Sequence, residues 1–93
     1  MRIAVDLDGT LCEDMPDWRD YHKAPPIEKW IMKIRKLAQE GHEIIIYTAR
    51  PNVDREVTTR WLKDNNVPYT ALVMDKLRAD LYIDQDSKRM EEL

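Results

Sequence analysis

The first twelve residues constrain the fold more than any other stretch of the chain. A short apolar run at residues 3–5 is typical of a buried strand, and it ends abruptly in Asp6 and Asp8. Because side chains alternate along an extended chain, both acids point to the same side. Two close carboxylates repel each other unless a cation lies between them. Gly9 then permits a turn that brings backbone groups close to a ligand. The stretch indicates an anion and metal site, or else an acidic strand end followed by an ordinary turn.

Length, charge and cysteine usage bound the class of protein. Ninety-three residues allow one compact domain, over residues 1–93. With 15 basic and 18 acidic residues and a net charge of −3, the chain has no overall electrostatic footprint for nucleic acid. No apolar stretch approaches the roughly 20 residues of a membrane span, and we expect no secretory leader. The single cysteine, Cys12, fits a reducing compartment. We therefore expect a cytoplasmic protein with no membrane partner, and nucleic acid is disfavoured.

The rest of the chain alternates predicted helices with predicted strands. Apolar residues at helical spacing predict helices over residues 27–38 and 53–62, and apolar runs predict strands at 44–47, 69–74 and 81–83. This alternation predicts an α/β domain with a minimal Rossmann-like parallel sheet of about four strands and flanking helices. We expect the first strand to be central, with the second and third on one side and the fourth on the other. Open sheets of this kind bind ligands beyond the carboxyl ends of their strands.

A long proline-containing connection, residues 11–26, follows the acidic motif. Such loops are usually functional or mobile, so we expect a flap at the mouth of the site. Its aromatic residues, Trp18 among them, either contact substrate or only cover the edge of the core.

Polar residues end three of the predicted strands at the same edge of the sheet. They are Asp6 with Asp8, then Thr48, then Asp84. The string Asp6-Leu7-Asp8-Gly9-Thr10 resembles the first signature motif of the haloacid dehalogenase (HAD) superfamily of phosphatases. The strings at residues 47–50 and 76–84 look like those of small members associated with capsule and polysaccharide synthesis. The connection at residues 11–26 is too short for the cap domain of that superfamily, so the resemblance implies a HAD-type domain without a cap.

The resemblance implies a role for each candidate residue. Asp6 is the nucleophile that forms an aspartyl-phosphate, and Asp8 passes protons to and from the leaving group and water. Phosphate is bound by Thr48, Lys76 and Gly9. A Mg²⁺ ion is held by Asp6, Asp8 and Asp84, which offer the oxygen ligands that this metal prefers.

Three features depart from the pattern or stay open. Leu77 follows Lys76 where the family often has proline, and the link at residues 75–80 is short for a parallel crossover. Gln85 replaces a second acid, which predicts weakened metal binding. Arg50 is either a contact for substrate or a surface arginine, and it is a substitute for Lys76 as the phosphate-binding cation.

The function expected from these features is that of a Mg²⁺-dependent phosphatase. Its substrate would be a small phosphorylated metabolite, with a sugar phosphate favoured. One alternative is removal of phosphate from nucleotides or nucleic-acid ends, because an open site admits large substrates. Another is a degenerate HAD-like domain that binds or regulates without turnover. The small open domain also suggests a homo-oligomer.

Overall fold

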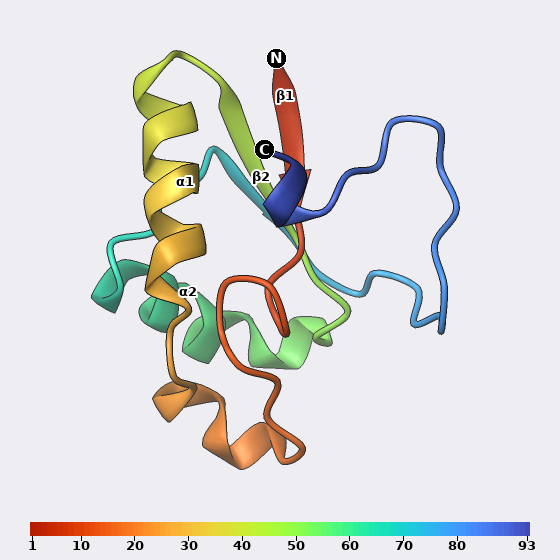
Figure 1. Cartoon of the computed structure of the whole chain (residues 1–93). Helices are drawn as coiled ribbons and strands as arrows, with labels where there is room; N and C mark the ends of the chain where they lie inside the picture. The colour runs from red at the N-terminus through yellow and green to blue at the C-terminus, as the bar shows by residue number, and fades with distance from the viewer.

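The computed structural model describes all residues, 1–93, as a three-stranded parallel sheet with two α-helices (Figure 1). The strands are β1 (Arg2–Val5), β2 (Glu43–Tyr47) and β3 (Ala71–Val73), and the helices are α1 (Glu28–Gln39) and α2 (Arg55–Asp64). Three short 3-10 turns complete the chain: η1 (Trp18–Lys23), η2 (Asn52–Asp54) and η3 (Met90–Glu92). The strand order is β1-β2-β3, with Val5 opposite Ile46 and Ile45 opposite Ala71. The predicted class, an α/β domain with a parallel sheet and no cap, is confirmed.

The predicted fourth strand does not form, so the sheet has three strands and β1 lies at its edge. Residues 77–89, here named the arm, contain no helix or strand and extend away from the body on the side opposite α1 (Figure 1). Leu81 and Ile83, the apolar residues of the expected strand, are 72% and 89% exposed. The six residues 75–80 are too few for a parallel crossover, which normally needs a dozen or more.

The core lies between the sheet and the two helices. Ile31 and Ile34 of α1, Trp61 and Leu62 of α2, and Ile44 and Ile46 of β2 are almost completely buried. The helix predicted over residues 53–62 needs one correction. Val53 is 85% exposed, and Thr58 is buried with the apolar residues of α2 instead. Val53 belongs to η2, which precedes the regular helix, so helical periodicity does not reach it.

The connection between β1 and α1 is held by a bond between its two ends and by a bond from α2. The Ile27 N–H donates to the Leu11 carbonyl at 2.8 Å, and the Trp61 indole N–H donates to the Ala24 carbonyl at 2.8 Å. Asp14, Met15, Pro16 and Tyr21 of this loop lie at the end of the sheet where the acids are. None of the helices is both long and apolar enough to cross a lipid bilayer.

Candidate active site

The acidic motif forms a tight turn at the end of β1. Leu7, between the two acids, is fully buried, and its carbonyl accepts the Leu11 N–H at 2.8 Å. Gly9 has φ of +80°, a left-handed conformation that disfavours side chains, and its N–H donates to the Cys12 carbonyl at 2.8 Å. The Gly9 amide is therefore engaged within the turn. Burial of the leucine anchors the turn and leaves Asp6 and Asp8 on its outer side.

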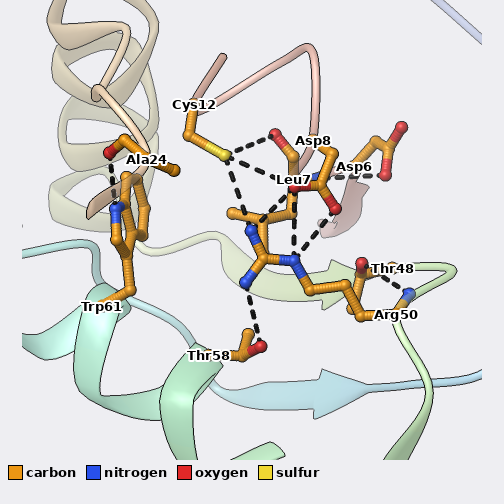
Figure 2. Close-up of polar contacts among 9 residues, drawn as sticks. All are labelled: Asp6, Leu7, Asp8, Cys12, Ala24, Thr48, Arg50, Thr58 and Trp61. Carbon is orange, nitrogen blue, oxygen red and sulfur yellow. Dashed lines mark hydrogen bonds and ion pairs between the residues drawn. The ribbon is translucent and has the colours of Figure 1, made fainter. Parts of the chain in front are cut away.

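Asp8 is held by Arg50, which follows β2 (Figure 2). The Arg50 Nε donates to Asp8 Oδ2 at 3.0 Å and to Oδ1 at 3.2 Å, and Nη2 donates to Oδ1 at 2.7 Å. The Arg50 side chain is fully buried, whereas the Asp8 side chain is 21% exposed. This bidentate geometry is the strong form of an arginine–carboxylate pair, and it fixes the orientation of Asp8.

The other contacts of Arg50 leave it no freedom to reach a substrate. Its Nη1 donates to the buried Thr58 hydroxyl at 3.0 Å, and its guanidinium carbon lies 3.9 Å from the centre of the Tyr21 ring. Burial alone would lower the pKa of Arg50, but the hydrogen bonds and charge of Asp8 outweigh burial and raise it. Of the two sequence interpretations, a surface arginine is wrong, and the structure places Arg50 behind Asp8 and not beside a ligand.

Thr48 and Lys76 lie at the same edge of the sheet. Thr48 is fully buried; its hydroxyl oxygen accepts the Arg50 N–H at 3.1 Å, and its carbonyl accepts the Lys76 N–H at 2.9 Å. The Lys76 ammonium lies 4.3 Å from the centre of the Tyr82 ring and 5.2 Å from that of Tyr47. The backbone bond thus attaches Lys76 to the end of β2, close to the acids.

Asp6 differs from Asp8 in its surroundings. Its carboxylate accepts the Leu7 N–H at 2.8 Å and has no ion-pair partner in contact. Partial burial raises the pKa of Asp6, the Leu7 hydrogen bond and the positive charge of Lys76 oppose that effect, and the charges of Asp8 and Asp14 add to it. Asp6 is therefore the acid that remains available to a ligand.

A depression of about 480 Å³ lies over the two acids. It is lined by residues of the acidic turn, of the following loop, and of the segments after β2 and β3: Asp6, Asp8, Asp14, Met15, Pro16, Tyr21, Ala49, Arg78, Ala79 and Tyr82. Sequence reasoning missed Asp14, Arg78 and Thr58 as parts of this site. The only sequence signal for Thr58 was its helical spacing with Trp61 and Leu62, which places it on the buried face of the helix.

Asp84, Gln85 and Trp18 are not brought to the depression. Asp84 and Gln85 lie exposed on the arm, where Asp84 accepts the Asp86 N–H at 3.2 Å. Trp18 is 61% exposed on η1 and packs against Arg19 at 5.6 Å. No group of three acids, histidines or cysteines in the chain is arranged to hold a metal ion. The structure therefore brings two of the three predicted Mg²⁺ ligands, Asp6 and Asp8, to the depression, and leaves Asp84 away from it.

The comparison with known families agrees with this arrangement of an acidic turn, a buried threonine and a lysine. The family model of the polynucleotide kinase PNKP phosphatase domain matches residues 1–90. The chain belongs to this family. It is therefore a HAD-superfamily domain, as the acidic motif predicted. Phosphatases of the HAD superfamily generally use Mg²⁺.

Solved structures show the same fold. The crystal structure of an MCSG target from Vibrio cholerae has a TM-score of 0.85 and 31% sequence identity, and the match covers 98% of this chain and 85% of that one. The structure of the Pnkp1/Rnl/Hen1 complex matches with a TM-score of 0.72 and 26% identity over 85% of this chain. The structure of the Pnkp1/Rnl/Hen1 RNA repair complex matches with a TM-score of 0.70 and 25% identity over 98%. The chain spans 30% of the matched chain in each of these complexes. No curated protein matches the chain.

Proposed function

We propose that the chain is a phosphatase that hydrolyses phosphate monoesters with Asp6 as the nucleophile. The observation that carries this proposal is the unequal environment of the two acids: Asp6 faces the depression without an ion-pair partner, whereas Arg50 holds both oxygens of Asp8. A nucleophile must approach phosphorus, and only Asp6 is placed to do so.

The proposed reaction has two steps. An Asp6 oxygen forms a bond to phosphorus as the bond to the leaving oxygen breaks. Asp8 enters this step in its protonated form and gives that oxygen its proton. Water then attacks the aspartyl-phosphate, Asp8 takes a proton from this water, and inorganic phosphate leaves with Asp6 restored. Arg50 is a positioning residue here, because it touches Asp8 and does not line the depression.

Charge balance sets a further requirement on this site. Asp6, Asp8 and Asp14 line the depression, and a phosphate dianion would be repelled by them. The positive charge of Lys76 attracts Asp6, and Arg50 offsets Asp8. Mg²⁺ would neutralise more of the charge. Asp84 does not lie beside Asp6 and Asp8 to complete its predicted site, so no step is assigned to it.

For the substrate class, the family match supports the phosphate-bearing end of a nucleotide or nucleic acid over the sugar phosphate favoured by the sequence. The matched family is a polynucleotide kinase phosphatase domain. Exposed aromatic rings at Tyr47 and Tyr82, with the Lys76 ammonium near both, offer surfaces on which a base can stack beside the acids.

Hydrolysis of p-nitrophenyl phosphate tests the reaction. We expect turnover that is lost by about 10³-fold or more in Asp6→Asn. Asp64→Asn, at the exposed end of α2, is the matched control and should keep full activity. The assay is run with Mg²⁺ and with a chelator. Activity that survives Asp6→Asn would refute the mechanism, and a folded wild-type chain with no activity would favour the binding-domain alternative.

A second assay tests the substrate class. Single-stranded oligonucleotides phosphorylated at either end are compared with sugar phosphates at equal concentration. We expect a higher kcat/KM for an oligonucleotide, and Tyr82→Ala should raise its KM more than that of a sugar phosphate. A preference for sugar phosphates would overturn this part of the proposal and leave the reaction intact.

A further inference from the structure

The depression over the acids has one positively charged side chain in its lining. Asp6, Asp8 and Asp14 line it as acids, and Arg78 is the only base among its lining residues. Arg78 is exposed, and its guanidinium takes part in no ion pair within the chain. A guanidinium that lines a depression without an acidic partner of its own is available to an anion from outside the chain.

The two other cations of the site are already engaged. Arg50 is fully buried and binds both oxygens of Asp8. The positive charge of Lys76 acts on Asp6, where the proposed reaction takes place. Neither cation is free to bind a part of the substrate that lies away from the reacting phosphorus. Arg78 is therefore the cation that remains for that part.

Tyr82 holds the backbone on both sides of Arg78. Its hydroxyl donates to the Leu77 carbonyl and accepts the Ala79 N–H at 3.1 Å. The Tyr82 ring also lies 4.3 Å from the Lys76 ammonium, and the Lys76 N–H is bound to the carboxyl end of β2. The turn that carries Arg78 is thus closed by contacts within the chain and attached to the sheet. Because this backbone is ordered before a ligand arrives, binding to Arg78 costs less entropy.

We propose that Arg78 is a specificity-determining residue that binds a second anion of the substrate, the phosphodiester next to the phosphate that Asp6 attacks. The inference rests on the proposed function for the identity of the attacked phosphate. A guanidinium suits this role because its planar N–H groups bind two phosphate oxygens at once and because it is always charged. The depression, at about 480 Å³, is within the range of about 300–1,000 Å³ that holds whole ligands, so it has room for more than one phosphate group.

The aromatic rings beside the depression favour a nucleic-acid strand over a small bisphosphate. Tyr47 and Tyr82 are 39% and 48% exposed, and both rings lie near the Lys76 ammonium. Each nucleotide of a single strand offers a base that stacks on such a ring and a phosphate that pairs with a cation. A sugar bisphosphate offers the second phosphate but no base. A ring and a cation on the same short turn, at Tyr82 and Arg78, therefore match the strand.

A neutral linkage tests the contact. Two dinucleotides carry the same terminal phosphate, and their nucleosides are joined by a phosphodiester in one and by an uncharged methylphosphonate in the other. We expect the wild-type chain to hydrolyse the phosphodiester form with a kcat/KM about tenfold higher. Arg78→Gln should remove this preference, and Arg78→Lys should keep part of it. Arg60→Gln, on the exposed face of α2 and away from the depression, is the matched control and should keep the full preference.

Two results of this assay would overturn the inference. One is a preference for the phosphodiester form that survives in Arg78→Gln. The other is a larger loss in Arg78→Gln on a sugar bisphosphate than on the dinucleotide, which would assign the contact to a small metabolite and not to nucleic acid.

Salt dependence of binding tests the contact without relying on turnover. A labelled single-stranded oligonucleotide with a terminal phosphate is titrated with Asp6→Asn by fluorescence anisotropy at several salt concentrations. The plot of log affinity against log salt should be less steep by about 0.7 in Asp6→Asn/Arg78→Gln, because one phosphate contact is lost, and unchanged in Asp6→Asn/Arg60→Gln. An unchanged slope in the Arg78 variant, or no measurable binding by Asp6→Asn, would overturn the inference. The predicted change in slope together with an inactive wild-type chain would refute only the proposed function.

Discussion

Replacing Arg50 by methionine tests whether this buried side chain organises the site. Methionine keeps an unbranched apolar stem of similar length and removes the guanidinium. The replacement leaves Asp8 without its cation, Thr58 without its donor and Tyr21 without the group stacked on its ring. Three elements lose a shared partner at once: the acidic turn, α2 and η1.

The magnitude follows from the burial of the pair. Breaking a buried ion pair by removing one partner costs about 3–5 kcal/mol. Asp8 is 21% exposed, so water can solvate it in part and the lower half of that range applies. Loss of the Thr58 hydrogen bond adds about 1 kcal/mol. A total of about 4–5 kcal/mol is a large share of the 5–15 kcal/mol typical of a domain. In a domain of this size it lowers Tm by about 16 °C or more.

Thermal and urea unfolding of Arg50→Met measures this loss against two controls. Arg2→Met removes an arginine from an exposed pair with Glu43, where the side chains are 76% and 53% exposed, and should cost less than about 1 kcal/mol. The Asp8→Asn/Arg50→Met double variant should be more stable than the sum of the single losses predicts, because it leaves no unpaired charge. A loss below about 1 kcal/mol, or additive effects of the two substitutions, would refute the argument.

Three further predictions concern single groups. Asp6→Asn should raise Tm at pH 7, because burial raises the pKa of Asp6 in the folded chain and its ionisation therefore costs stability as pH rises above 3.8. The gain in Tm should vanish below that pH in a melting series. Cys12 should resist iodoacetamide in the native chain at pH 8, because burial and Asp8 raise its pKa to about 12; rapid labelling measured by mass spectrometry would contradict this. Trp61→Phe should lower stability by about 1–3 kcal/mol through the unpaired Ala24 carbonyl, whereas an unchanged Tm would show that this bond does not hold the loop.

The elements with strong periodicity could be predicted from the sequence, and the termination of the sheet could not. Helical spacing over residues 27–38 predicted α1, and the apolar run at 44–47 predicted β2. Residues 81–83 have the composition of a strand but remain unpaired within the chain. Composition reports what a segment favours, whereas pairing also depends on the length of the link before it, here the six residues 75–80.

The site could be predicted in its chemistry but not in its internal contacts. The acids after β1 and the threonine after β2 follow from the rule that ligands bind at the carboxyl ends of parallel strands. The position of Arg50 does not, because its direction depends on whether Asp8, Thr58 and Tyr21 enclose a space that fits a guanidinium. A two-residue offset from Thr48 left a surface arginine and a substrate contact equally open. Its full burial decides against both.

Arg50 also explains how two acids that look equivalent in the sequence come to differ. Asp6 and Asp8 lie on the same side of one turn, and by spacing alone either could meet a ligand. Arg50 binds both oxygens of Asp8 and fixes it, while Asp6 keeps only the Leu7 N–H. The difference between the acids therefore arises from a residue 42 positions further along the chain. An Arg50→Lys variant keeps the charge and loses the bidentate geometry, so in the proposed reaction it should lower kcat while leaving KM nearly unchanged.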